Sequence, residues 1–130
     1  MVLCVGSRYA SEMNISSAAL LPPIGDVVDR TFASLVLGGS GPIVVEFMSY
    51  GCSHCRTLEP VIEQVAEELK SRETFFRVNV GLDRELADRY GITGTPTFLM
   101  FSDSREVGRV VGPRPDASSL ALAVTQPFAR

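Results

Sequence analysis

The sequence predicts one α/β domain in which a mixed sheet of four to five strands is flanked by helices on both faces. Patterns typical of helices and strands follow one another in the order helix, strand, helix, strand, helix, strand, strand, helix. Strands separated by a helix favour a parallel crossover, whereas the last two strands, joined by a short turn, favour a hairpin. A chain of 130 residues with 45% hydrophobic side chains can bury one compact core.

The first two predicted elements are a helix and a strand. Residues 26–37 carry apolar side chains at helical spacing, with Asp29 as the expected N-cap, and the glycine-rich run at 38–41 ends the helix. Residues 42–50 are a short apolar run rich in β-branched side chains, which is typical of a strand buried on both faces. Glu46 is the single acid inside this strand, and it therefore needs an explanation.

The longest helix is expected over residues 53–72. Its apolar stripe repeats at helical spacing and comprises Leu58, Ile62, Val65, Ala66 and Leu69. Pro60 lies inside the pattern and should kink the helix rather than end it, because the stripe continues in phase. The acidic side chains of Glu59, Glu63 and Glu67 are interpreted as a solvated face of this helix.

A second strand, a short helix, a hairpin and a last helix complete the predicted fold. Gly91 is expected to end the short helix, and Asp116 is expected to cap the last one. The expected ranges are 74–80 for the second strand, 83–92 for the short helix, 96–101 and 106–112 for the hairpin strands, and 116–125 for the last helix.

Charge and hydropathy argue against two classes of partner, nucleic acids and membranes. Fifteen acidic against twelve basic residues give a net charge of -3 without a basic block, so no nucleic-acid partner is expected. No apolar run approaches the roughly 20 residues of a membrane span, and the first residues lack the basic start of a secretory signal, so a cytoplasmic protein is predicted. Residues 1–22 are expected to be an N-terminal extension, which could be disordered, and residues 23–130 the folded domain.

Cys52 and Cys55 form the motif that carries chemistry. They are a C-x-x-C pair directly after the buried strand and at the start of the long helix, a position typical of redox-active pairs. Free N–H groups at the helix start would favour a thiolate at Cys52. A structural disulfide is disfavoured because so short a loop constrains little chain. A zinc site needs four ligands, and the third cysteine, Cys4, lies in the extension, so the metal alternative requires a site shared by two chains.

Two stretches around this pair resemble the thioredoxin family. VVEFMSYGCSHCRTLEPVIEQVA is similar to the family's active-site strand and helix, and YGITGTPTFLMF is similar to its proline loop and following strand. The resemblance spans residues 27–124 and implies the thioredoxin fold. It also implies that Cys52 is the attacking cysteine, Cys55 the resolving one, and Pro96 a cis-proline that faces them. A cis bond there would expose the backbone of Thr95 to a substrate strand.

The resemblance also implies a role for the acid in the first strand. Glu46 takes the place of the family's buried acid, where a desolvated carboxyl could accept and return the Cys55 proton. Arg77 stands where the family usually has a lysine. Because arginine stays charged, a contact with Glu46 would hold the carboxylate ionised and weaken that role, so a structural ion pair is the alternative.

Several positions depart from the family pattern. Ser53 and His54 stand between the cysteines in place of Gly-Pro, Gly51 and Met48 stand where tryptophans are usual, and the chain contains no tryptophan. A histidine before the second cysteine resembles the motifs of protein disulfide isomerases and bacterial disulfide oxidases. Its imidazole would stabilise the Cys52 thiolate and make the couple more oxidising. The alternative is that His54 is an ordinary residue at the start of a helix.

The expected function is thiol:disulfide exchange with protein disulfides or dithiols. Cys52, Cys55, His54 and Glu46 are the candidate catalytic residues. Substrate contacts are expected from the residues beside the pair and from the proline loop, namely Tyr50, Gly51, Ser53, Thr95, Pro96 and Gly112. No bound cofactor or metal is expected, the chain is expected to be a monomer, and a thioredoxin reductase or a small-thiol pool would recycle it. The alternatives are a general thioredoxin-type reductant and a non-catalytic module that binds peptides.

Overall fold

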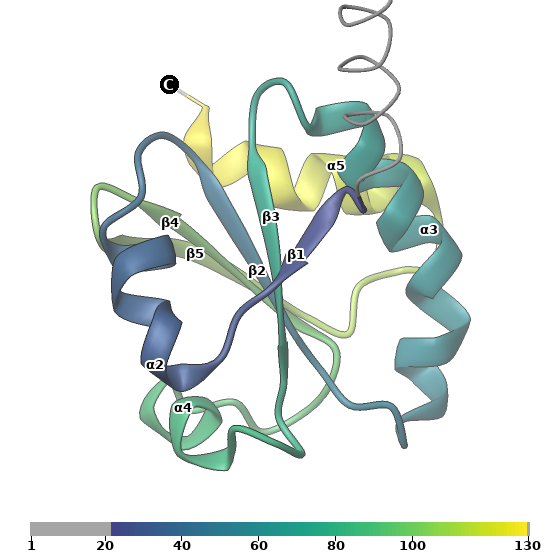
Figure 1. Cartoon of the computed structure of the whole chain (residues 1–130). Helices are drawn as coiled ribbons and strands as arrows, with labels where there is room; N and C mark the ends of the chain where they lie inside the picture. The colour runs from purple at the N-terminus through teal and green to yellow at the C-terminus, as the bar shows by residue number, and fades with distance from the viewer. Residues whose placement is uncertain (1–21, 130) are drawn as a thin grey trace, which may run out of the picture.

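The computed structural model describes residues 22–129 and confirms the α/β class, with a mixed sheet of five strands. Figure 1 shows the sheet in the middle of the molecule between two layers of helices. The strands lie in the order β1-β3-β2-β4-β5, and they are β1 (Ile24–Asp26), β2 (Ile43–Met48), β3 (Thr74–Asn79), β4 (Thr97–Ser102) and β5 (Arg105–Val111). The predicted N-terminal extension, including Cys4, lies outside the described residues except for Pro22.

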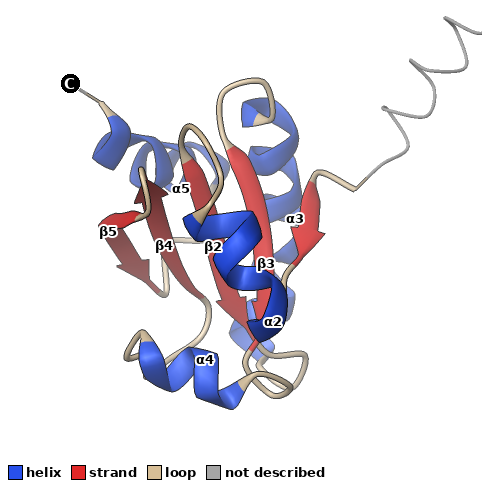
Figure 2. Ribbon diagram, turned by 60° about the vertical axis from the view of Figure 1, so that its left-hand side comes forward, coloured by secondary structure: helices blue, strands red, loops and turns tan. Residues whose placement is uncertain are grey.

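Helices cover both faces of the sheet, as Figure 2 shows. One face carries α3 and α5, and the other carries α2 and α4. Their bounds are α2 (Asp29–Phe32), which continues as the π-helical segment η1 (Ala33–Leu37), α3 (Ser53–Leu69), α4 (Arg84–Arg89), α5 (Ala117–Thr125) and the 3-10 turn η2 (Gln126–Phe128). None of the helices within residues 22–129 is long and apolar enough to cross a membrane.

The strand pairing matches the predicted crossover and hairpin. β2 and β3 are parallel and are joined by α3, whereas β4 runs antiparallel to β2. β4 and β5 form the hairpin. The two central residues of its turn have positive φ, 52° at Asp103 and 68° at Ser104, as in a two-residue hairpin turn.

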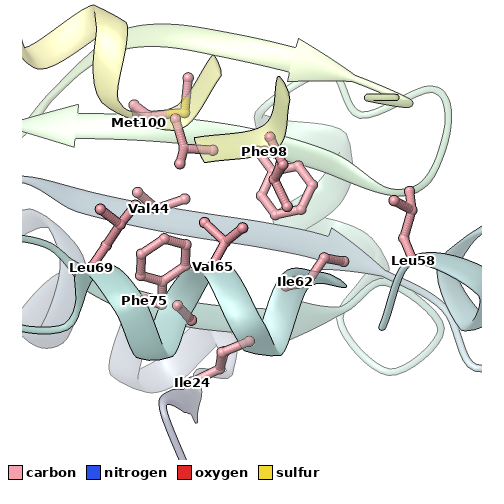
Figure 3. Close-up of a cluster of buried hydrophobic side chains, with 12 residues drawn as sticks. Ile24, Val44, Leu58, Ile62, Val65, Leu69, Phe75, Phe98 and Met100 are labelled. Carbon is pink, nitrogen blue, oxygen red and sulfur yellow. The ribbon is translucent and has the colours of Figure 1, made fainter. Parts of the chain in front are cut away.

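The alternation of side chains along β2 divides the core into two clusters. Val44 joins the cluster under α3 and α5, whereas Val45 and Phe47 join the cluster under α2 and α4. Glu46 has the same parity as Val44, so it lies on the face covered by α3. Figure 3 shows that first cluster, in which α3 packs on the strands through Leu58, Ile62 and Val65, against Phe98 and Met100.

Two details at the start of the domain differ from the sequence prediction. The N-cap of α2 is Val28, not Asp29. Thr31 Oγ1 accepts the Val28 N–H at 3.1 Å, while the Asp29 carboxylate pairs with Arg89 at 3.1 Å, so Asp29 is engaged elsewhere. The sequence predicts no strand at β1 because three residues are too few to show alternation, and among residues 22–129 its one partner is β3.

β5 is an edge strand of the sheet, and most of its side chains are exposed. Arg109 forms a forked ion pair with Glu106, with N–O distances of 2.6 and 2.9 Å. The same guanidinium donates to the backbone carbonyl of Tyr90 at 3.0 Å. The charged side chains of this edge are therefore held in place by local contacts.

Candidate active site

The two cysteines lie where β2 leads into α3. β2 ends at Met48, a short turn follows, and Cys52 is the N-cap of α3. The Cys52 Sγ accepts a hydrogen bond from the Cys55 backbone N–H at 3.3 Å, so the two residues are close together. Both thiols are free, Cys52 is partly exposed and Cys55 is buried. An accessible thiol backed by a shielded one is suited to an attack followed by a resolving step.

The proline loop lies against Cys52. The Thr95–Pro96 peptide bond is cis, as the family resemblance implies, and the Cys52 thiol donates to the Thr95 carbonyl at 3.4 Å. Two hydrogen bonds hold this loop. The Thr97 hydroxyl donates to a carbonyl within it at 2.6 Å, and the Gly112 N–H donates to the Pro96 carbonyl at 2.9 Å. The backbone of Thr95 is thus fixed beside the Cys52 sulfur.

The surroundings give the two thiols different acidities. Hydrogen bonding with the Thr95 side chain, followed by the N–H groups of Cys55 and His54, lowers the pKa of the Cys52 thiol to about 7. Donation to the Thr95 carbonyl opposes this, because it favours the neutral thiol. Burial raises the pKa of the Cys55 thiol, and the neighbouring Cys52 raises it further. Near neutral pH, Cys52 therefore supplies the thiolate and Cys55 keeps its proton.

Glu46 lies in β2 on the face covered by α3. It is 1% exposed, and its Oε1 accepts a hydrogen bond from Arg77 Nε at 3.0 Å. Arg77 therefore makes the contact with Glu46 on which the alternative of a structural ion pair depends. Arg77 Nη2 also pairs with Glu59 of α3. The second oxygen, Glu46 Oε2, is buried without a hydrogen-bond partner among residues 22–129.

Burial and ion pairing shift the pKa of Glu46 in opposite directions. Burial raises its pKa to about 7, Arg77 acts to lower that pKa, and the charges of Glu59 and Glu63 act to raise it. Desolvation thus outweighs the contact with arginine, which alone would hold the carboxylate ionised. A carboxyl with a pKa in this range can accept and return a proton near neutral pH.

His54 is exposed, and its imidazole lies over Gly112. A Cβ added to Gly112 would lie 3.4 Å from His54 Cε1, and the φ of 54° at Gly112 is one that other residues rarely adopt. The backbone N–H of His54 contributes to the lowered pKa of Cys52. An effect of the imidazole itself on the pair stays a prediction.

The predicted substrate contacts lie around the pair. Tyr50 is 67% exposed, and its carbonyl accepts a hydrogen bond from Arg56 Nη1 at 2.9 Å. Gly51 and Ser53 are also exposed. Thr95 is partly buried, Pro96 is buried, and Gly112 is bonded to the proline loop from the end of β5. That these residues bind substrate stays a prediction.

A cavity of about 290 Å³ adjoins Cys55, and it is lined by Met48, Ser49, Tyr50, Cys55, Arg56 and Glu59. The sequence pattern places Glu59 on a solvated helix face and gives no role to Arg56. Helical spacing could have identified Glu59, because it lies four residues after Cys55 and so shares its side of the helix. Within residues 22–129, no three His, Cys, Asp or Glu side chains are grouped so that they could hold a metal ion.

Comparisons with known proteins all match this chain to thioredoxins. The thioredoxin family model matches residues 24–125. The thioredoxin of Rickettsia bellii is 32% identical over 87 residues, which are 67% of this chain and 83% of that protein. Thioredoxin 1 of Synechococcus elongatus is 35% identical over 89 residues, which are 68% of this chain and 83% of that protein.

Solved structures of thioredoxins share the fold. A thioredoxin of Malassezia sympodialis has a TM-score of 0.71 at 29% identity, covering 82% of this chain and 91% of its own. A mutant thioredoxin of Halobacterium salinarum has a TM-score of 0.72 at 27% identity, covering 84% of this chain and 95% of its own. The family match includes the cysteine pair and the proline loop. The chain therefore belongs to the thioredoxin family, whose members in general act on disulfide substrates and have reductase partners, and it is a thiol:disulfide oxidoreductase.

Proposed function

We propose that this protein exchanges disulfides with protein substrates through Cys52 and Cys55, and that its couple is more oxidising than that of a typical thioredoxin. One observation carries the exchange activity: a Cys52 thiol with a pKa of about 7, the value usual for thioredoxins, lies next to a buried Cys55. The oxidising character rests on His54, whose imidazole at the helix start would stabilise the thiolate further. Stabilising the thiolate stabilises the reduced form of the couple. A couple with a more stable reduced form is the stronger oxidant.

Protein substrates fit the surroundings of the pair. The Thr95 backbone lies beside the Cys52 sulfur, where an extended substrate segment could pair with it as an added strand. Tyr50 and Val111 are 67% and 61% exposed. Val111 lies opposite Thr97, directly after the proline loop. Exposed apolar surface of this kind suits a polypeptide better than a small thiol.

The exchange proceeds in two steps. The Cys52 thiolate attacks one sulfur of the substrate disulfide, a mixed disulfide forms, and the other substrate sulfur leaves as a thiolate that takes up a proton. Cys55 then loses its proton and attacks the Cys52 sulfur, which closes the protein disulfide and releases the second substrate thiol. The substrate gains two electrons and two protons, and the protein dithiol loses them. In the opposite direction, the same steps oxidise a substrate dithiol.

The residues that differ from the family pattern support the oxidising character. His54 places an imidazole at the helix start, where a positive charge would further stabilise the thiolate. Met48 and Gly51 stand where tryptophans are usual, and Met48 lines the cavity beside Cys55. The partners of this protein would therefore differ from those of an ordinary thioredoxin. A thioredoxin reductase or a small-thiol pool would recycle the pair, and a cytoplasmic, monomeric protein remains the prediction from the sequence.

The reduction potential of the Cys52–Cys55 couple tests the proposal directly. The purified protein is equilibrated against graded ratios of reduced and oxidised glutathione, and its disulfide content is measured by thiol alkylation and mass spectrometry. We expect a potential between about -220 and -120 mV. A value of about -270 mV, that of a reducing thioredoxin, would contradict the oxidising character. His54→Pro is the matched variant, and it should move the potential toward the reducing value.

Two cysteine variants separate exchange from simple peptide binding. Cys52→Ser should abolish turnover of a disulfide substrate, because Cys55, the other cysteine within residues 22–129, is buried. Cys55→Ser should instead accumulate mixed disulfides with protein substrates, because the resolving step is lost. Retention of all partners by Cys52→Ser, together with no mixed disulfides in Cys55→Ser, would favour a binding module.

A further inference from the structure

Arg77 of β3 is shared between two carboxylates. Its Nε donates to Glu46 Oε1 at 3.0 Å, and its Nη2 pairs with Glu59 of α3. Exposure increases along these three side chains, from 1% for Glu46 to 14% for Arg77 and 29% for Glu59. One guanidinium therefore links a fully buried acid to an acid that reaches solvent.

The fold fixes this arrangement from two directions. Glu46 and Arg77 are Cα partners in the parallel β2–β3 pair, so the register places their side chains on the same face of the sheet. Glu59 comes from α3, which covers that face, and it lines the cavity beside Cys55. A guanidinium presents several N–H groups in a planar fork, so it can bind both carboxylates at once.

Sharing weakens the hold of Arg77 on Glu46. A guanidinium paired with Glu46 alone would apply its whole positive charge to that carboxylate. The negative charge of Glu59 offsets part of this field, and it acts to raise the Glu46 pKa. Glu46 Oε2 makes no hydrogen bond among residues 22–129, so one oxygen of the buried carboxyl is available for a proton.

We propose that Glu59 is a positioning residue for the proton transfer at Cys55, because by taking part of the Arg77 guanidinium it keeps Glu46 able to accept the Cys55 proton. This inference rests on the exchange reaction proposed above. The Cys55 S–H bond breaks, the proton passes to Glu46, and the Cys55 sulfur bonds to Cys52 as the substrate thiolate leaves. That thiolate then takes a proton from Glu46 or from water, so the step balances.

Other charged groups face the same region but make different contacts. Glu63 of α3 also acts to raise the Glu46 pKa, and Tyr50 acts on Arg77. Asp26 of β1 is opposite Arg77 in the β1–β3 pair and lines a cavity of about 250 Å³ with it. From β4, the residue opposite Glu46 is the uncharged Phe98. Within residues 22–129, the carboxylates in direct contact with Arg77 are those of Glu46 and Glu59.

The test compares Glu59→Gln with Glu67→Gln. Each variant removes one negative charge from α3, but Glu67 pairs with Lys70 rather than with Arg77. The reduced protein is mixed with a nitrobenzoate disulfide, which releases one coloured thiolate when Cys52 attacks and a second when Cys55 resolves the mixed disulfide. Stopped flow follows the second phase from about pH 5 to about pH 9, across the range in which Glu46 titrates.

We expect Glu59→Gln to move the midpoint of the second phase to lower pH by roughly one unit, because Arg77 then acts on Glu46 alone. A weaker base at Glu46 should also slow this phase about threefold at neutral pH. Glu67→Gln should match the unmodified protein. An unshifted midpoint in Glu59→Gln would overturn the inference, and so would an equal shift in Glu67→Gln, which would indicate a general effect of charge.

The unmodified protein and Glu46→Gln together distinguish a failure of this inference from a failure of the reaction on which it rests. If the unmodified protein shows no second phase, the exchange reaction fails and the inference fails with it. If the second phase is present and Glu46→Gln leaves it unchanged, Glu46 accepts no proton, and the inference falls while the exchange reaction stands. If Glu46→Gln slows the second phase and Glu59→Gln leaves its midpoint in place, the inference alone is wrong. Circular dichroism spectra of the three variants should be identical, since each substitution replaces a carboxylate with an amide of the same shape.

Discussion

Two buried glutamates, Glu46 and Glu73, differ in what surrounds them. Glu46 lies within β2 on the way to the cysteine pair and is 1% exposed, whereas Glu73 lies directly before β3 and is 6% exposed. Burial raises the pKa of each carboxyl to about 7. Each also has one oxygen without a hydrogen-bond partner among residues 22–129.

Their neighbours separate these two similar acids. Glu46 pairs with Arg77 on the face of the sheet that α3 covers. Glu73 lines a cavity of about 470 Å³ with Arg72, Leu122 and Phe128, and the charge of Arg72 acts to lower its pKa. Burial alone is therefore enough to produce a carboxyl that titrates near neutral pH. Its position relative to the redox pair decides whether such a carboxyl can take part in the reaction.

The largest expected difference between the two acids is in the rate of the resolving step. Glu46→Gln should slow the attack of Cys55 on the mixed disulfide by roughly 100-fold at neutral pH, because an amide cannot accept the proton. Glu73→Gln should leave that rate unchanged, because Glu73 lies beyond the opposite ends of β2 and β3. Single-turnover kinetics with the nitrobenzoate disulfide measure both variants. Equal slowing in the two variants would show that position relative to the cysteine pair does not decide which buried acid affects the resolving step.

The next effect is on the pH dependence of stability. The folded-state pKa of Glu46 is raised above its ordinary value of 4.5, so the folded protein binds more protons than the unfolded chain between these two values. The free energy of unfolding should therefore fall by about 3 kcal/mol as the pH rises from about 4.5 to about 8. Glu46→Gln should remove this fall. Urea titrations at the two ends of this pH range measure the fall in the free energy of unfolding. An equal fall in Glu46→Gln and in the unmodified protein would mean that Glu46 is ionised throughout the range.

Glu73→Gln should change the pH dependence of stability in the same direction and by a similar amount. Burial also raises the pKa of this carboxyl to about 7, so its contribution is likewise lost as the pH rises toward neutrality. The same urea titrations provide the measurement. A change well below that of Glu46→Gln would mean that the cavity beside Glu73 admits enough solvent to screen the ionised form.

The smallest expected effect is that of Gly91→Ala, which controls for a loss of stability that does not involve a carboxyl group. Gly91 has a φ of 65°, and a Cβ added there would meet no atom within 4 Å. Gly91→Ala should therefore cost about 1 kcal/mol of unfolding free energy through backbone strain alone. This cost should not depend on pH, and turnover should be unaffected. A slower resolving step in this variant would mean that loss of stability, and not loss of a proton acceptor, can slow catalysis.

Much of the fold was predictable because its elements carry local patterns. Three predicted features each depend on residues that are close in sequence, and the structure confirms them: the apolar stripe of α3, the Asp116 cap and the turn of the β4–β5 hairpin. Strand β1 escaped prediction because its three residues depend on the pairing with β3. Asp29 was wrongly expected to cap α2, because its ion pair with Arg89 spans sixty residues of sequence.

In the candidate site, too, the local motifs were predictable, whereas the contacts between elements were not. The C-x-x-C pair is a short motif, so the sequence was enough to locate it, and the cis-proline followed from the resemblance to the thioredoxin family. The contact of Arg77 with Glu46 could be stated only as a condition, since it depends on strand register. Glu59 was interpreted as solvated because its spacing with Glu63 and Glu67 is also that of an exposed helix face. Its ion-pair partner is the guanidinium of Arg77, which belongs to β3 and is distant in sequence.

The exposed edge of β5 bears on how the protein behaves at high concentration. An edge strand offers unpaired N–H and C=O groups on which a second sheet could extend. Here a neighbouring copy would have to bury the forked pair of Arg109 and Glu106 and the exposed side chain of Arg105. Charged side chains along an edge make such stacking unfavourable. We expect concentrated solutions to resist edge-to-edge aggregation, and neutralising Glu106 and Arg109 together should promote light scattering on prolonged storage.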